Sequence, residues 1–309
     1  MRIAPTQHGR PWRDFGSETA IACAAVLYGS TFVVVQNALD HTTPSALNFL
    51  RFGLGALVLA PFAIRRGWRG PAPRANDSVR TMMASGIAIG TVAFVAYLTQ
   101  NIGLQHTSTS NSAFITGLFA VFTPIFEVAI LRRRPGATTA IAVVVAVAGL
   151  LLLTGAQPTA RVGDAVTLVA AVFFGLWFIQ IAIFTPRFDV ITLVAVEAAT
   201  VCALSAPVAV ADGFGRLDGD VWLAVVFTGV GCTAVAFSLS TWAQRRVEAS
   251  RASIINLLEP VVAGVVGYSV GERLGIGGYA GAALILVAMV IAESGAWRDT
   301  PAPLPPHAG

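Results

Sequence analysis

The chain has 309 residues, of which 55% are hydrophobic and only 12% charged, with a net charge of +4 at pH 7. Soluble domains carry about 25% charged residues, so this composition excludes an ordinary soluble domain. The apolar residues form long, non-alternating runs rather than the alternating segments of a membrane barrel, which predicts an all-α membrane protein.

Ten apolar segments follow one another along the chain, and a helix needs about 20 residues to span a bilayer. The sequence therefore predicts ten transmembrane helices. They cover residues 18–38, 44–64, 79–103, 109–131, 137–155, 163–184, 190–210, 221–243, 250–271 and 277–294. Residues 1–17 lack the apolar core of a signal peptide and form a predicted N-terminal tail. The proline-rich residues 295–309 form a predicted disordered tail.

The arginines give the predicted orientation, since short cytoplasmic loops are enriched in basic residues. All twenty basic residues are arginine. Sixteen of them flank one set of helix ends, three flank the other, and Arg51 lies inside a segment. Both tails should therefore be cytoplasmic. Because these arginines lie in short loops, the positive charge does not indicate a nucleic-acid partner.

The second half of the chain repeats the first. The stretch "AAVLYGSTF" (24–32) recurs as "AAVFFGLWF" (170–178), an offset of 146 residues that also maps Arg51 onto Glu197. Later in each half an offset of 140 residues aligns the two copies. Each half carries five segments, and because five is odd the second half should enter the membrane from the opposite side. Inverted repeats of this kind are typical of secondary transporters, whose substrate site lies between the repeats.

Charged residues inside membrane helices are costly and favour functional roles. Glu259 is the one charge between Ala252 and Gly271, and Asn256 lies one turn before it. Pro260 removes a backbone donor and frees the carbonyl of Asn256. Two interpretations remain open: a helix that lines a hydrated substrate cavity, or a structural kink that pairs with a neighbouring helix.

The fourth segment provides a counterpart, with Thr116 as a candidate substrate contact and Pro124 as a candidate hinge that lies four residues after the repeat position of Pro260. Arg51 could bind a substrate carboxylate through its guanidinium, could pair with Glu197, or could be structural. Further candidates for hydrogen bonds or aromatic contacts with a substrate are Tyr28, Thr31, Tyr97, Gln100 and Trp177.

Several kinds of chemistry have no motif here. All four histidines lie in loops or tails, so no intramembrane metal site is expected. No phosphate-binding loop is present, which excludes ATP hydrolysis by this chain. The sequence also lacks the nucleophile and zinc motifs that an intramembrane enzyme would need. We expect no cofactor, no metal and no enzymatic activity.

Four motifs resemble the EamA branch of the drug/metabolite transporter superfamily. They are "YGSTF" (28–32), "ALNFLRFGLGAL" (46–57), "TSTSNSAFITGLFAVFTPIFE" (107–127) and "ASRASIINLLEPVVAGVVGYSVGERL" (249–274). The resemblance covers about residues 18–294. It implies ten helices in two inverted repeats, 18–155 and 163–294, in a bacterial inner membrane. Tyr28 departs from the pattern, since tryptophan is frequent before the glycine of the first motif.

These observations predict a secondary transporter that works by alternating access. The resemblance implies a small metabolite or drug as substrate, with an amino acid as one candidate, and export as the direction. Expected partners are the small-molecule substrate, the lipid bilayer and, as coupling ion, protons carried by Glu259. The alternatives are an uncoupled facilitator or exchanger of the same fold and, less favoured, an intramembrane enzyme. Oligomeric state is not encoded in any visible pattern.

Overall fold

A computed structural model describes residues 11–107, 109–132, 136–154, 162–269 and 275–298. These residues are helical, with loops between the helices and no strand among them. The elements in chain order are α1 (Pro11–Gly29), α2 (Phe32–Leu39), α3 (Pro44–Arg66), α4 (Val79–His106), α5 (Thr109–Gly117), α6 (Phe119–Phe126), the π-helix η1 (Glu127–Leu131), α7 (Ala137–Thr154), α8 (Val162–Phe184), α9 (Val190–Asp212), α10 (Gly219–Val226), the π-helix η2 (Phe227–Ala236), α11 (Phe237–Ala243), α12 (Ala249–Asn256), α13 (Leu258–Ser269) and α14 (Ile276–Arg298).

Seven helical stretches are long and apolar enough to cross a membrane, which confirms the predicted all-α membrane class. They are Gly16–Leu39, Pro44–Arg66, Val79–His106, Val162–Phe184, Val190–Asp212, Gly219–Ala243 and Ala249–Val266. Three shorter apolar helices, Ile115–Leu131, Ala137–Leu152 and Ile276–Ala292, fall on the remaining predicted segments. The count of ten spans stays a prediction. The two tails also stay predictions, because residues 1–10 and 299–309 lie outside the described residues. Four of the arginines lie outside them as well, namely Arg133, Arg134, Arg161 and Arg273.

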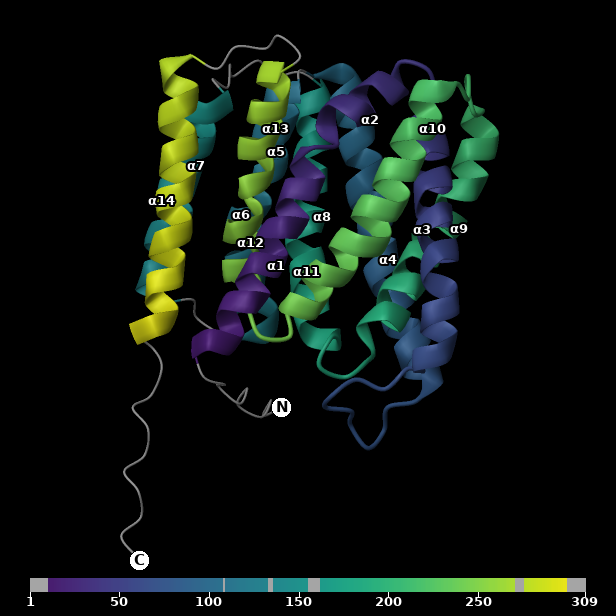
Figure 1. Cartoon of the computed structure of the whole chain (residues 1–309), viewed down its shortest axis with the longest axis horizontal. Coiled ribbons are helices and arrows are strands. Elements are labelled where there is room, and N and C mark those ends of the chain that lie inside the picture. Colours follow the sequence, from purple (N-terminus) through teal and green to yellow (C-terminus); the bar gives the residue numbers. More distant parts are fainter. Residues whose placement is uncertain (1–10, 108, 133–135, 155–161, 270–274, 299–309) are drawn as a thin grey trace, which may run out of the picture.

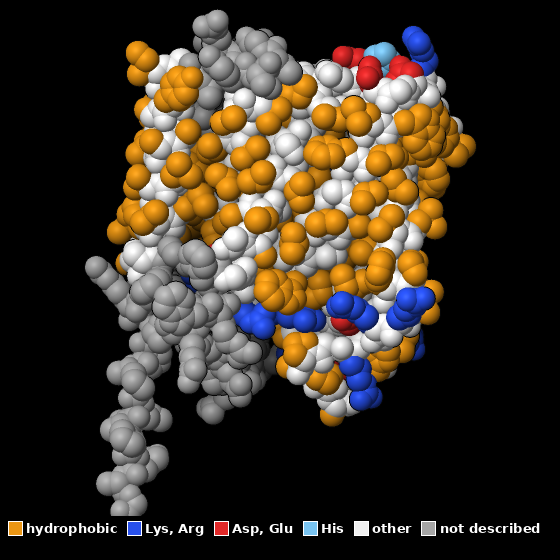
Figure 2. All heavy atoms as spheres, viewed as in Figure 1, with side chains coloured by type: hydrophobic (Ala, Val, Ile, Leu, Met, Phe, Trp, Pro, Cys, Tyr) orange, Lys and Arg blue, Asp and Glu red, His pale blue; other side chains and the backbone are white. Residues whose placement is uncertain are grey.

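The helices form one upright bundle (Figure 1), and the face seen in Figure 2 carries a broad apolar band. Leu57, Val144 and Val210 are each at least 70% exposed, as expected for side chains that face lipid rather than water. Within the bundle α3 packs along α9, α4 along α8, and α7 along α14. In Figure 1 the chain descends from α5 to α6 but ascends from α12 to α13.

Three of the apolar stretches are interrupted. The breaks fall at Ser30–Thr31 between α1 and α2, at Leu118 between α5 and α6, and at Leu257 between α12 and α13. The predicted hinges Pro124 and Pro260 both lie after these breaks. Pro260 is the third residue of α13. Backbone amides in the first turn of a helix have no intrahelical acceptor, so a proline there removes no hydrogen bond. The stretch is therefore interrupted at Leu257, before Pro260, and not by a kink at the proline.

Close glycine contacts recur in the two halves. A Cβ added to Gly90 would lie 2.7 Å from the carbonyl oxygen of Glu197. A Cβ added to Gly229 would lie 2.8 Å from the carbonyl oxygen of Arg51. Arg51 and Glu197 are separated by the 146-residue offset of the sequence repeat. The contact of α4 with α9 in this region therefore corresponds to the contact of η2 with α3.

A second pair of contacts follows the same rule. A Cβ on Gly29 would lie 2.7 Å from Val262 Cβ, and one on Gly175 would lie 2.8 Å from Phe122 Cβ. Gly29 maps onto Gly175 with the offset of 146 residues, and Phe122 maps onto Val262 with the offset of 140. The packing of α1 on α13 thus matches the packing of α8 on α6.

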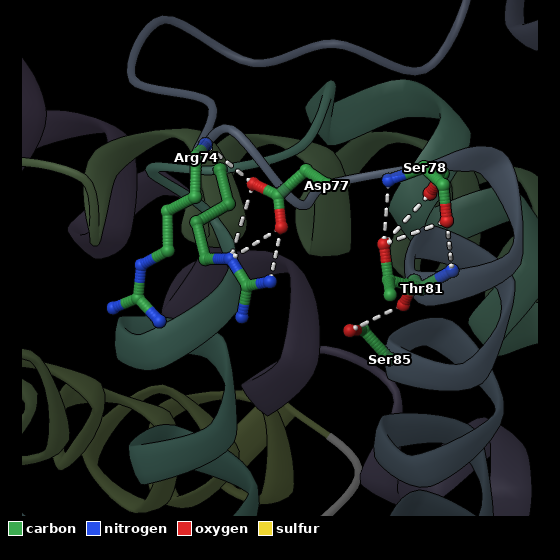
Figure 3. Close-up of polar contacts among 6 residues, drawn as sticks. Arg74, Asp77, Ser78, Thr81 and Ser85 are labelled. Carbon is green, nitrogen blue, oxygen red and sulfur yellow. Dashed lines mark hydrogen bonds and ion pairs between the residues drawn. The ribbon is translucent and has the colours of Figure 1, made fainter.

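One end of the bundle is held by contacts that we call the arginine clamp, between residues 67–77 and 185–192. Arg187 forms an ion pair with Asp77. Figure 3 shows Asp77 beside the Ser78–Thr81 cap that begins α4. The Gly70 amide donates to the Arg187 carbonyl at 3.0 Å. The hydrogen bond from Arg187 holds the pKa of the Asp77 carboxyl below its ordinary value.

The other end is held by the histidine clamp, between residues 41–45 and 212–218. His41 forms an ion pair with Asp218, and the Arg216 amide donates to the His41 carbonyl at 2.8 Å. His41 maps onto Arg187, and Gly70 onto Arg216, with the offset of 146 residues. Each clamp joins a loop of the first half to a loop of the second.

Candidate functional site

One cavity inside the bundle collects every side chain that the sequence singles out for substrate binding. The cavity contains about 700 Å³ of empty space, including the part that opens outward. The predicted residues that line it are Tyr28, Thr31, Arg51, Tyr97, Gln100, Thr116, Trp177, Asn256 and Glu259. The candidate hinges Pro124 and Pro260 are not part of the lining. The structure therefore brings these nine residues together, and their role in binding stays a prediction.

The helix breaks explain how polar groups reach the middle of an apolar bundle. Thr31 lies in the first break, Thr116 two residues before the second, and Asn256 directly before the third. Helix ends leave backbone amides and carbonyls without intrahelical partners. In membrane proteins such irregular backbone is tolerated where it lines a cavity. The interruptions thus favour a hydrated site at this depth.

Arg51 is the cation of the cavity. Its side chain is buried, with the guanidinium carbon 4.6 Å from the ring centroid of Tyr97 and 4.7 Å from that of Phe52. Its Nε atom has no hydrogen-bond partner in the described part of the chain, and no ion pair of Arg51 occurs there. The direct pair with Glu197 that the sequence suggests is therefore not formed.

Glu197 has a different partner. The indole nitrogen of Trp177 donates to Glu197 Oε1 at 2.6 Å. Trp177 lines the cavity, whereas Glu197 is only 1% exposed and is not among the lining residues. The carboxylate consequently lies behind the cavity wall and contacts it through the tryptophan.

Neutral polar groups surround the rest of the cavity. Gln100 Nε2 lies 3.4 Å from Thr116 Oγ1, a weak hydrogen bond between α4 and α5. The Tyr28 hydroxyl and Asn256 Oδ1 are buried and have no partner within the described residues. Since buried polar groups are normally hydrogen-bonded, these two atoms are available to a bound ligand.

Aromatic rings form much of the wall. Tyr97 meets Phe174 edge to face, with ring centroids 4.9 Å apart, and Phe119 lies 5.5 Å from Phe178. The sequence did not single out Phe119, Phe174 or Phe178, because phenylalanine in an apolar run resembles ordinary core. A usable signal was the spacing of Phe174, Trp177 and Phe178, which places them on one face of α8.

Comparison with known proteins identifies a family over nearly the whole chain. The EamA-like transporter family matches residues 17–155 and again residues 161–293. An uncharacterized transporter of Archaeoglobus fulgidus is 30% identical over 277 residues, covering 89% of this chain and 85% of the relative. The uncharacterized transporter YcxC of Bacillus subtilis (strain 168) is 25% identical over 293 residues, covering 88% and 92% of the two chains.

The fold also matches a solved protein. A crystal structure superposes with a TM-score of 0.73 at 19% sequence identity, covering 91% of this chain and 98% of that one. At this identity the likeness concerns the fold alone.

Proposed function

The chain belongs to the EamA-like transporter family, and on this premise we propose that it is a secondary transporter that exports a small zwitterionic metabolite, with an amino acid as the leading candidate. Membership confirms the resemblance drawn from the sequence motifs. It also leaves the alternative of an intramembrane enzyme without support. The substrate class, the direction and the mechanism are the proposal.

The observation that carries the proposal is the pair of opposite charges in one aromatic cavity. Arg51 from α3 and Glu259 from α13 both line it, and neither forms an ion pair within the described residues. A guanidinium binds carboxylates in bidentate fashion, and a carboxylate complements an ammonium group. A zwitterion would satisfy both groups, while the rings of Tyr97 and Trp177 would enclose its apolar part.

The mechanism we propose is alternating access between two inverted repeats, residues 18–155 and 163–294. The recurring glycine contacts and clamps support a repeat, and the opposite directions of α5–α6 and α12–α13 in Figure 1 support its inversion. In such transporters the repeats rock about a site at their interface. Arg51 and Glu259 come from opposite repeats, as this mechanism requires.

The orientation we propose places the arginine-rich end in the cytoplasm. Figure 2 shows basic side chains gathered mainly near the end where α1 begins, with an acidic side chain among them, and acidic, histidine and basic side chains together at the other end. Both tails would then be cytoplasmic, in the inner membrane of a bacterium. Glu259 is the candidate proton carrier if export is coupled to a proton gradient.

Reconstitution tests the proposal. Proteoliposomes loaded with a mixture of radiolabelled amino acids should release label faster than protein-free liposomes. Hydrogen bonds to charged groups contribute about 1.5–3 kcal/mol, so Arg51→Gln and Glu259→Gln should each lower the release rate by about ten- to a hundredfold. Ser205→Ala, a buried change on α9 outside the cavity lining, serves as the control.

Two results would change the assignment. If both cavity variants release label as fast as wild type, the cavity is not the substrate site. If an inward proton gradient leaves the rate unchanged, proton coupling is rejected and the protein is an uncoupled facilitator or exchanger.

A further inference from the structure

Trp177 and Glu197 form a buried hydrogen-bonded pair, and a gain in folding stability does not explain why a carboxyl group is buried there. Glu197 Oε1 accepts the indole hydrogen bond at 2.6 Å, and Oε2 has no partner in the described part of the chain. A buried carboxyl group with a single hydrogen bond is costly compared with an apolar side chain of similar size. Such a group is retained more readily where it fixes the position of a functional side chain.

Glu197 provides the hydrogen bond that orients Trp177 within the described residues. The aromatic rings that the indole contacts are Phe178, at a centroid distance of 5.2 Å, and Phe237, at 5.4 Å. Aromatic contacts of this kind tolerate a range of angles, whereas the indole nitrogen offers one donor with one direction. The hydrogen bond therefore selects the plane of the ring that faces the cavity.

Glu197 is itself held in place by the helix packing. Its carbonyl oxygen lies against Gly90, where an added Cβ would come within 2.7 Å. The backbone of α9 is thus fixed on α4 at this residue. The packed backbone of α9 fixes Glu197, and the hydrogen bond from Glu197 fixes the Trp177 ring in the cavity wall.

The repeat makes the arrangement more specific. The residue equivalent to Trp177 in the first half is Thr31, and the equivalent of Glu197 is Arg51. Thr31 lies in a helix break, and Arg51 lines the cavity directly. In the second half α8 is unbroken, and the carboxylate is separated from the cavity by the indole. The two halves therefore use equivalent positions differently.

We infer that Glu197 is a positioning residue that holds the Trp177 indole in the cavity wall and thereby sets the affinity for a substrate that Glu197 does not touch. The effect on substrate affinity rests on the proposed function, in which the cavity is the transport site. Its structural part, the orientation of Trp177 by Glu197, stands independently and can be measured without any substrate.

The first experiment observes Trp177 alone. In a protein whose other five tryptophans are changed to phenylalanine, acrylamide quenching reports how well the Trp177 ring is held in the wall. Glu197→Gln keeps a carbonyl acceptor and should leave quenching close to that of the parent. Glu197→Met has similar volume but no comparable acceptor, and should raise the quenching constant. Ser205→Ala on the same helix should change nothing.

The second experiment measures label release from the amino-acid proteoliposomes. Glu197→Met should lower the rate by about tenfold, the loss of about 1.4 kcal/mol, and Glu197→Gln should restore most of it. Trp177→Phe removes the indole donor and should lower the rate by a similar factor. Adding Glu197→Met to Trp177→Phe should then cost nothing more, because the interaction is already absent.

The outcomes separate the two proposals. Equal quenching in Glu197→Met and Glu197→Gln overturns the positioning role, and so does additive loss in the double variant. If Glu197→Met yields no folded protein, Glu197→Gln and Trp177→Phe decide alone: a Gln variant as impaired as Trp177→Phe overturns the role. Absence of release by the wild-type protein overturns the proposed function, while the quenching result still decides the orientation of Trp177.

Discussion

The two clamps hold opposite ends of the bundle with the same backbone contacts but with different bases. Gly70 and Arg216 occupy equivalent positions in the two halves, and in each clamp the backbone amide of this residue donates to the carbonyl of the basic residue in the ion pair. At one end that base is Arg187 and at the other it is His41. The side chains of Arg187 and Asp77 are 17% and 1% exposed, whereas those of His41 and Asp218 are 33% and 28% exposed.

This difference shows which features the repeat has kept. Backbone contacts and glycine approaches recur at equivalent positions, because both halves must pack in the same way. The charged side chains of the cavity and the clamps differ between the halves: Arg51 corresponds to Glu197, and His41 corresponds to Arg187. The shared scaffold thus carries different chemistry in its two halves, and the following predictions test first the scaffold and then the chemistry.

The largest effect should come from the paired glycines. Gly90→Ala and Gly229→Ala each place a Cβ less than 3.0 Å from a backbone carbonyl oxygen that cannot move without shifting a helix. Overpacking of this kind costs about 1–3 kcal/mol. If the two contacts are equivalent, thermal unfolding in detergent should show a similar decrease of the unfolding midpoint for both variants.

Gly231→Ala is the matched control on η2, because its Cβ would meet only Phe227 at 4.0 Å. A large loss for one glycine of the pair and none for the other would show that the two contacts are not equivalent.

The all-α membrane class could be predicted from the sequence, because long apolar runs predict apolar helices. The offset between "YGSTF" and "FGLWF" predicts the repeat. The helix breaks were harder to place, because proline suggested them at Pro124 and Pro260. The observed breaks at Leu118 and Leu257 precede those prolines, and nothing in the identity of a leucine marks the end of a helix.

The cavity was predictable where polarity made it visible. Arg51 and Glu259 stand out in apolar segments, and both line it. Phe119 and Leu104 also line the cavity but carry no such contrast, so they cannot be told from lipid-facing or core residues without the packing. The partner of Glu197 was missed for another reason: the repeat suggested Arg51, while the actual donor Trp177 lies 20 residues earlier on the preceding helix.

A smaller effect should come from the arginine clamp. Asp77→Asn removes the carboxylate that pairs with Arg187 and should lower stability by about 0.5–1 kcal/mol at pH 7. Because the pKa of Asp77 is lowered in the folded protein, its contribution is present above the unfolded pKa and is lost as pH falls through the folded value. Unfolding midpoints of wild type and variant should therefore converge in acid.

Asp220→Asn, an exposed change in the first turn of α10 at the other end of the bundle, measures the loss of a favourable charge at a helix start without the loss of an ion pair. If Asp77→Asn is as stable as wild type at pH 7, the ion pair contributes nothing and the clamp is held by its backbone contacts alone.

The smallest effect should come from the carboxylate of the histidine clamp. Desolvation raises the pKa of Asp218, but hydrogen bonds from the Val221 amide and from His41 outweigh it, so the pKa lies below its ordinary value. The contribution of Asp218 to stability is therefore present above its unfolded pKa and is lost as pH falls through the folded value.

Asp218→Asn should lower the unfolding midpoint at pH 7 by less than Asp77→Asn does. The side chains of His41 and Asp218 are more exposed than those of Arg187 and Asp77, and exposed pairs contribute little. The amide oxygen of asparagine can still accept from the Val221 amide, as Asp218 Oδ1 does, so the variant removes the charge and keeps the helix cap. The midpoints of wild type and Asp218→Asn should converge in acid. A loss as large as that of Asp77→Asn would show that the two clamps contribute equally despite their different exposure.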